Sequence, residues 1–316
     1  MGADHVEGAS GRGKTLVALA LAVAAISCSA PGNDARRSAL GDDAITVASF
    51  DFPESVVLAE VYAQALEAGG FRVERALSLG PREFVAPALA AGLVELVPEY
   101  AGTAAEFVSL QRAEPSDDPA RAHDELVDVL EASGSRVTAL AGALAQDANT
   151  FVVTAATAAE HGLTTLSDLR LVAGDLTFGG PPECATRPRC LAGLTEVYGL
   201  RFGAVTVLDT GGPLTRQALR SDVVDVALLF TTDPILVTDE LVELVDDRRL
   251  QPAENVTPLV RTEVIETWGT EVVGLMDNVS RRMTTANLRQ FNASLSRSGA
   301  TPAEVAAQWL EREGLA

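Results

Sequence analysis

The feature that most restricts the fold of this 316-residue chain is a regular alternation of short apolar runs and helical patterns. It starts with a strand-like run at 44–49 and a helical pattern that begins at Pro53 and stops at Gly69. Proline at the first helical position and glycine after the last are typical of helix ends. The alternation starts again at residue 151. Alternating strands and helices predict an α/β fold of mostly parallel sheets with helices on both faces.

The same reading gives the remaining elements of the chain. The Asp118 side chain is expected to cap a helix that starts at Pro119, and Thr301 begins a capping-box pattern near the C-terminus. The expected strands are 44–49, 71–77, 93–97, 151–155, 176–178, 205–208 and 223–230. The expected helices are 53–68, 82–91, 119–133, a helix near Ser167, 191–197, 213–220 and most of the tail from Thr262.

Two segments of the chain resemble each other at a constant offset of 130 residues. Residues 88–96 match 218–226, and at this offset Glu95 matches Asp225 and Tyr100 matches Phe230. In α/β sheets ligands bind beyond the carboxyl ends of the strands. The repeat therefore predicts two similar lobes with an aromatic ring at the mouth of each sheet. Chance similarity between two short αβ units is the alternative.

Composition excludes several classes of function. The chain has 24 Lys and Arg against 44 Asp and Glu, so its formal charge of −20 would repel nucleic acid. No phosphate-binding or hydrolase motif is present, and His123 and His161 have no evident catalytic partner. We therefore expect a binding protein without a cofactor and not an enzyme.

The N-terminus reads as an export signal. Arg12 and Lys14 precede an apolar run at 15–26 that ends in small residues before Cys28. This arrangement is typical of a secretory signal, and the run is too short to span a membrane. The cysteine in this place resembles the lipidation site of bacterial lipoproteins. We expect a signal peptide at 1–27, lipidation of Cys28, a tether at 28–43 and an extracytoplasmic, lipid-anchored protein; a buried N-terminal helix is the alternative.

Two further cysteines, Cys184 and Cys190, lie six residues apart. In an oxidising compartment such a pair predicts a disulfide. Closing so short a loop is worth about 2 kcal/mol. A metal site is the rival interpretation, but two thiolates without a nearby histidine are too few ligands for a structural zinc ion. We therefore expect no metal.

Four segments in order make the chain similar to a known family. The chain resembles the substrate-binding proteins of osmoprotectant ABC importers, of the glycine betaine, choline and carnitine type, from about residue 44 to the C-terminus. The likeness rests most on Pro-Glu-Tyr-Ala-Gly-Thr at 98–103 and Gly-Gly-Pro-Pro-Glu at 179–183. The other two segments are 45–54 and 229–233.

The resemblance implies a two-lobed type II periplasmic-binding-protein fold. Lobe one would comprise 44–148 and 256–316, and lobe two 149–255. A quaternary ammonium ion would bind between the lobes of a monomer, which would deliver it to the membrane permease. The alternatives are the same fold binding an unrelated amine or amino acid for import or sensing, and a surface adhesin.

A trimethylammonium group has a diffuse charge and no N–H donor, so aromatic faces suit it better than ion pairs do. The resemblance places the ring walls at Tyr100, Phe151 and Phe230. It adds polar partners for the ligand at Thr103, Asn149, Thr231 and Thr232. Arg187, or less securely Arg189, matches the arginine that would hold a ligand carboxylate.

The sequence departs from the family pattern at two places. Phe50 stands where betaine-binding relatives often carry lysine, and a cage tyrosine is replaced near Glu254. Phe50 is expected to supply a substitute ring, and Asp51 or Glu254 a negative charge. These changes favour a plain cation such as choline, whereas a site containing Arg187 would favour betaine or carnitine. The choice of osmolyte stays open at this level.

Overall fold

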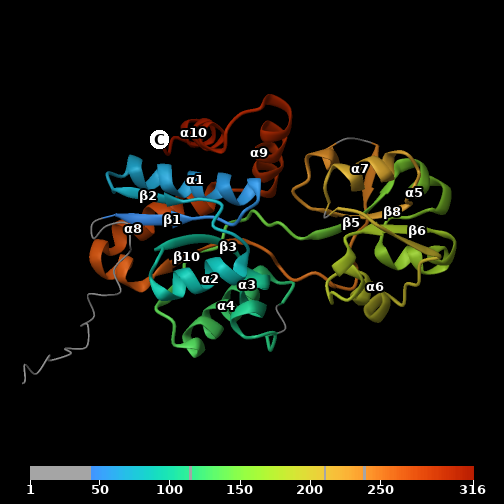
Figure 1. The fold of residues 1–316 in the computed structure, drawn as a ribbon, viewed down its shortest axis with the longest axis horizontal. Coiled ribbons are helices and arrows are strands. Elements are labelled where there is room, and N and C mark those ends of the chain that lie inside the picture. The colour runs from blue at the N-terminus through green and yellow to red at the C-terminus, as the bar shows by residue number, and fades with distance from the viewer. Residues whose placement is uncertain (1–43, 114–115, 210, 238–239) are drawn as a thin grey trace, which may run out of the picture. The chain divides into compact units, whose positions relative to one another are not determined.

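The computed structural model describes residues 44–113, 116–209, 211–237 and 240–316. The expected signal peptide, Cys28 and the tether lie outside these residues. The described chain forms two five-stranded sheets, ordered β2-β1-β3-β10-β4 and β7-β6-β8-β5-β9, each flanked by helices (Figure 1). We call each sheet with its helices a lobe, the first and the second in this order. The α/β, two-lobed fold expected from the sequence is confirmed.

The strands are short in both sheets. The first sheet contains β1 (Ile45–Ala48), β2 (Val73–Ala76), β3 (Leu96–Tyr100), β4 (Val137–Ala139) and β10 (Val256–Arg261). The second sheet contains β5 (Asn149–Thr154), β6 (Thr177–Gly180), β7 (Ala204–Val207), β8 (Val226–Phe230) and β9 (Leu241–Glu243). The lobe boundaries at residues 148 and 256 stay a prediction.

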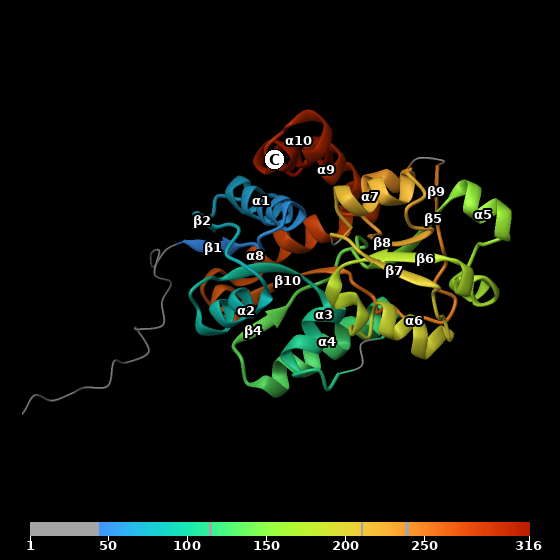
Figure 2. The same cartoon turned by 45° about the vertical axis from the view of Figure 1, so that its right-hand side comes forward.

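Helices cover both faces of each sheet. The α-helices are α1 (Pro53–Ala68), α2 (Arg82–Ala91), α3 (Ala101–Val108), α4 (Pro119–Ser133), α5 (Ala155–His161), α6 (Leu191–Tyr198), α7 (Pro213–Arg220), α8 (Thr262–Arg282), α9 (Thr285–Ser298) and α10 (Pro302–Glu313). Short 3₁₀ turns are η2 (Leu166–Leu171), η3 (Ala173–Asp175), η4 (Pro182–Ala185) and η5 (Pro234–Val237). In Figures 1 and 2, α1 and α10 lie on one side of the first sheet and α2, α3 and α4 on the other.

The sequence predicts parallel pairing, and three strands of each sheet do pair in parallel. One strand of each sheet runs in the opposite direction, which the sequence did not predict. Strand β10 runs antiparallel to β3 and β4, and β5 runs antiparallel to β8 and β9. Both reversed strands directly follow a segment that crosses from one sheet to the other. A strand that enters from the other lobe starts at the edge where the parallel strands end, so it must run in the opposite direction. The sequence analysis did not predict strand β10 or the short edge strands β4 and β9.

The internal repeat is visible in the structure. Tyr100 ends β3 opposite Val256, and Phe230 ends β8 opposite Asn149. The paired acids have the same role in both lobes, because Glu95 accepts from the Thr46 backbone N–H at 2.8 Å and Asp225 from the Thr177 N–H at 2.7 Å. These acids hold neighbouring strands together and are structural.

Local predictions about helix ends and cysteines are also confirmed. The Asp118 carboxylate accepts from the Arg121 backbone N–H at 3.0 Å, and Thr301 forms the expected capping box with Glu304. Cys184 and Cys190 form a disulfide with their Cα atoms 5.1 Å apart. Among the described residues no helix is long and apolar enough to cross a membrane.

Candidate functional site

Three aromatic rings of the first lobe stack in a row at the carboxyl ends of β1 and β3. The Phe50 and Phe52 ring centroids are 5.8 Å apart with the planes nearly parallel, and those of Phe52 and Tyr100 are 6.2 Å apart. Phe50 and Tyr100 are buried, whereas Phe52 is 37% exposed. Phe52 is therefore the most exposed ring of this aromatic row. Aromatic faces of this kind attract a cation and bury its methyl groups.

A charged network supports the aromatic row from behind. Arg82 lies 5.4 Å from the Phe50 ring centroid and forms a bidentate ion pair with the buried Glu99, with both N–O distances 2.9 Å. It also donates to the Thr103 hydroxyl at 2.9 Å. The Glu254 carboxylate accepts from the Thr103 N–H at 3.1 Å and hydroxyl at 3.3 Å. Burial raises the pKa of Glu254 to about 8, despite the Thr103 N–H and the nearby Arg82.

The Tyr100 hydroxyl leads to a second group of acids. It donates to Glu54 Oε1 at 2.8 Å, and Asn292 Nδ2 of α9 donates to Glu54 Oε2 at 2.6 Å. The same amide donates to the Thr232 carbonyl at 3.2 Å. Asn292 thus connects an acid of the first lobe to the end of a second-lobe strand. Burial raises the pKa of Glu54, and burial and the negative charge of Glu54 raise that of Tyr100.

Two chain segments cross side by side between the sheets. They pair through an antiparallel bridge between Gln146 and Asn255, and the Asp147 N–H donates to the Glu254 carbonyl at 3.1 Å. We call residues 146–148 and 253–255 the crossing segments. They pack on the start of α3, where a side chain at Gly102 would lie 3.0 Å from the Ala253 carbonyl oxygen. The glycine of the Pro-Glu-Tyr-Ala-Gly-Thr segment is required for this close approach.

The polar candidates of the second lobe lie next to the first crossing segment. The Thr232 hydroxyl donates to Asp147 Oδ1 at 2.9 Å, and the Thr231 hydroxyl accepts from the Ala148 N–H at 3.0 Å. Asn149 donates to the Arg189 carbonyl at 3.1 Å. Phe230 is partly buried, and its ring lies against Gly211, where a Cβ would come within 3.1 Å.

Two of the predicted site residues do not join the aromatic row and its neighbouring acids. Phe151 is 1% exposed and packs in the second-lobe core against Phe178, with ring centroids 6.2 Å apart. The reason is its position in β5, whose residues 150–153 are all buried. Asp51 is exposed at the surface beside the aromatic row. We leave Phe151 and Asp51 out of the site that we propose.

The two candidate arginines have different surroundings. The Arg187 side chain is 65% exposed and its guanidinium lies 3.9 Å from Glu183. Arg189 is directed at the first lobe, where its guanidinium binds Glu106 Oε1 at 2.7 and 3.1 Å. A third contact, to the Leu250 carbonyl at 2.9 Å, holds the same side chain. Arg189 therefore already forms an ion pair with a carboxylate of the protein itself.

Sequence reasoning missed several residues of this site. Phe52 and Glu54 lie in the 45–54 segment that carried the family resemblance, and Phe52 follows Phe50 by two residues, which places both rings on one side of an extended chain. Asp147 precedes Asn149 by the same spacing. Asn292 has no local signal, because its partner Glu54 is 238 residues away.

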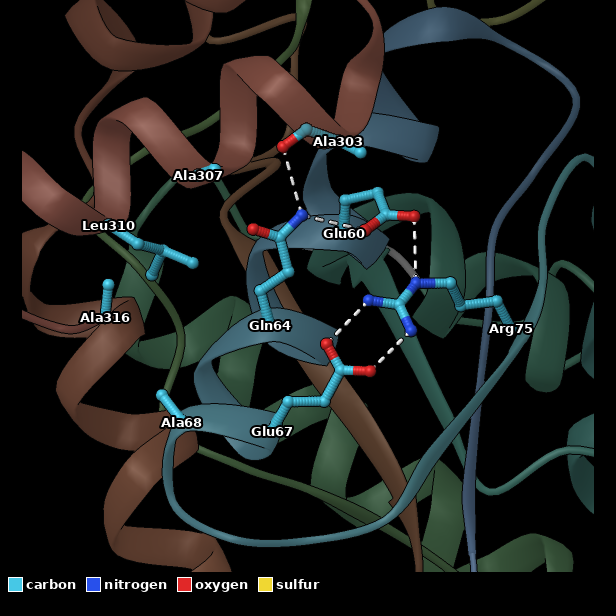
Figure 3. Close-up of a pocket in the computed structure, with 9 residues that line it drawn as sticks. All are labelled: Glu60, Gln64, Glu67, Ala68, Arg75, Ala303, Ala307, Leu310 and Ala316. Atoms are coloured by element: carbon cyan, nitrogen blue, oxygen red, sulfur yellow. Dashed lines mark hydrogen bonds and ion pairs between the residues drawn. The ribbon is translucent and has the colours of Figure 1, made fainter.

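A separate cavity of about 610 Å³ lies between α1 and α10 (Figure 3). Its charged groups pair with one another, since Arg75 binds both Glu60 and Glu67 and Gln64 bonds to the Ala303 carbonyl. None of the predicted site residues lines it. Within the described part of the chain no cluster of His, Cys, Asp and Glu has the arrangement of a metal site.

The two-lobed α/β fold is that of the type II periplasmic binding proteins. A family profile, the substrate binding domain of ABC-type glycine betaine transport system, matches residues 43–312. The chain belongs to this family.

Individual relatives agree with this assignment. The glycine betaine-binding protein YehZ of Escherichia coli K12 is 24% identical over 269 residues, which cover 83% of this chain and 88% of the relative. The carnitine transport binding protein OpuCC of Listeria monocytogenes is 25% identical and covers 90% and 91%. A solved glycine betaine/carnitine/choline ABC transporter structure superposes with a TM-score of 0.76 at 22% identity, covering 86% of this chain and 99% of that one. That structure shows the shared fold.

Proposed function

We propose that this protein captures a quaternary-ammonium osmolyte between its two lobes and delivers it to the permease of an ABC importer. The observation that carries the proposal is the aromatic row of Phe50, Phe52 and Tyr100 beside buried carboxyl groups. Aromatic faces supply about 0.5–2 kcal/mol each to a bound cation, and micromolar affinity requires about 8 kcal/mol. Burial of the ligand methyl groups supplies the remainder.

Calorimetric titration of the protein from residue 44 to 316 with choline, glycine betaine, carnitine and proline betaine tests the ligand class. We expect at least one of these compounds to bind with a Kd of about 10 μM or lower, because the rings and the methyl burial act together. Proline and glycine, which lack a quaternary ammonium, are the controls and should bind at least about 100-fold more weakly. The absence of heat with all four ligands would refute the proposal.

We also propose that the protein is a lipoprotein anchored through Cys28. The basic residues, the short apolar run and the small residues before this cysteine support the assignment. In a bacterial host, a labelled fatty acid should be incorporated into the wild-type chain and should be absent from Cys28→Ser. Equal labelling of the two chains would exclude this anchor.

A further inference from the structure

A carboxyl pair lies where the two lobes meet. Glu54, at the start of α1, is 5% exposed. A chain of hydrogen bonds through Asn292 and Thr232 connects its carboxyl group to that of Asp147 on the crossing segment. The donors around the pair come from both lobes: Tyr100 and Asn292 donate to Glu54, and Thr232 donates to Asp147. The pair is thus hydrogen-bonded directly to Tyr100, one of the rings of the aromatic row.

The pair has no positive partner within the described protein. The ion pairs of the described residues do not include Glu54 or Asp147. Two carboxylates in one network that is largely shielded from water can both ionise only at a high free-energy cost. In agreement, loss of hydration raises the pKa of both groups, and the charge of Glu54 raises that of Asp147 further.

The arginines on the neighbouring helices α2, α7 and α9 are already held by partners of their own. Arg289 of α9 donates to the Thr231 carbonyl, Arg216 of α7 binds Asp233, and Arg82 of α2 binds Glu99. Glu254, on the second crossing segment, is a further acid near Asp147 and raises the pKa of Asp147. The surroundings therefore favour arrival of an external cation.

We propose that Glu54 and Asp147 determine specificity at the ligand site: the pair shares one proton without ligand, and releases it when a ligand of net positive charge binds the neighbouring rings. This inference rests on the proposed function. The released proton passes to the solvent buffer, and the second carboxylate charge that remains balances the ligand cation. The pair thus selects a monocation of the choline type.

The arginines of the second lobe explain why a zwitterion is disfavoured. A ligand carboxylate next to Glu54 and Asp147 would be repelled unless a guanidinium accompanied it. Arg189 is held by Glu106 and the Leu250 carbonyl, and Arg187 lies exposed beside Glu183. We therefore expect choline to bind at least about tenfold more tightly than glycine betaine, a difference of about 1.4 kcal/mol.

The test measures protons and affinity together. Choline is titrated calorimetrically at one pH in phosphate and in Tris, whose ionisation enthalpies differ, so that the difference in heat counts the protons released. The Kd is then measured from pH 5.5 to 8. A released proton makes binding weaker at low pH, with the Kd rising by up to about tenfold for each unit of pH decrease below the pKa of the pair.

Variants assign the proton to the pair. The double variant Glu54→Gln/Asp147→Asn should release no proton, lose the pH dependence and bind choline and glycine betaine within about threefold of each other. The single variants Glu54→Gln and Asp147→Asn serve if the double variant does not fold, and each should show a flatter pH profile. The exposed acid Glu160 in α5 is the matched control, and Glu160→Gln should behave as wild type.

Each outcome bears on one of the two proposals. Choline binding that releases no proton, or release that persists in the double variant, overturns the role of the pair while the proposed function stands. If Glu254→Gln releases no proton while the double variant still releases one, the proton belongs to Glu254. This result also overturns the role of the pair. Failure of the wild-type chain to bind any quaternary ammonium compound overturns the proposed function, and with it this inference.

Discussion

Replacing Tyr100 by alanine is expected to raise the Kd for the bound quaternary ammonium ion about 100-fold. A desolvated aromatic face contributes about 2 kcal/mol to a cation, and burial of a ligand methyl group against it adds about 0.8 kcal/mol. A total of about 3 kcal/mol corresponds to about two orders of magnitude in affinity. The expected loss is large because Tyr100 is buried against Phe52 and holds Glu54 through its hydroxyl. Calorimetric titration measures it.

The variant Tyr100→Phe separates the ring from its hydroxyl. It keeps the aromatic face but removes the donor to Glu54, so we expect affinity within about tenfold of wild type. The pH dependence of its binding should also extend to higher pH, because Glu54 loses a hydrogen bond that lowers its pKa. If Tyr100→Ala binds as tightly as wild type, the ring does not contact the ligand and the proposed site is wrong.

The second large effect is expected for Arg82→Met, which should lower the free energy of unfolding by about 3–5 kcal/mol. Glu99 is 3% exposed and receives two hydrogen bonds from Arg82. Removing one partner of a buried ion pair leaves an uncompensated buried charge, and this cost is typical of such changes. Methionine keeps the apolar volume over Phe50, so the variant tests charge more than packing. Thermal and urea unfolding measure the loss.

An exposed ion pair of the same chemistry is the matched control. Arg72 lies 3.0 Å from Glu74 with its side chain 63% exposed. Exposed pairs contribute about 0–1 kcal/mol, so Arg72→Met should be nearly neutral. Equal destabilisation by the two variants would show that burial of the Arg82–Glu99 pair does not matter.

The sequence by itself determined most of the strands and helices of this protein and the correspondence between its two halves. Proline at the start of α1 and capping residues such as Asp118 act within one helical turn, so their effect can be read locally. The repeat placed Tyr100 and Phe230 at equivalent strand ends, because the pattern of a strand and its flanking helix is itself local. The segment that carried the family resemblance also contained Phe52 and Glu54.

Only the tertiary structure decided which of these residues meet. A strand exposes alternate side chains to opposite faces, and the sequence does not say which face of β5 packs on the core; the structure puts Phe151 inside and leaves Phe52 accessible. The reversal of β5 and β10 follows from where the chain crosses between sheets. The contacts of Glu54 with Asn292 and Tyr100 join segments far apart in the chain, and such contacts depend on how whole elements pack rather than on any local pattern.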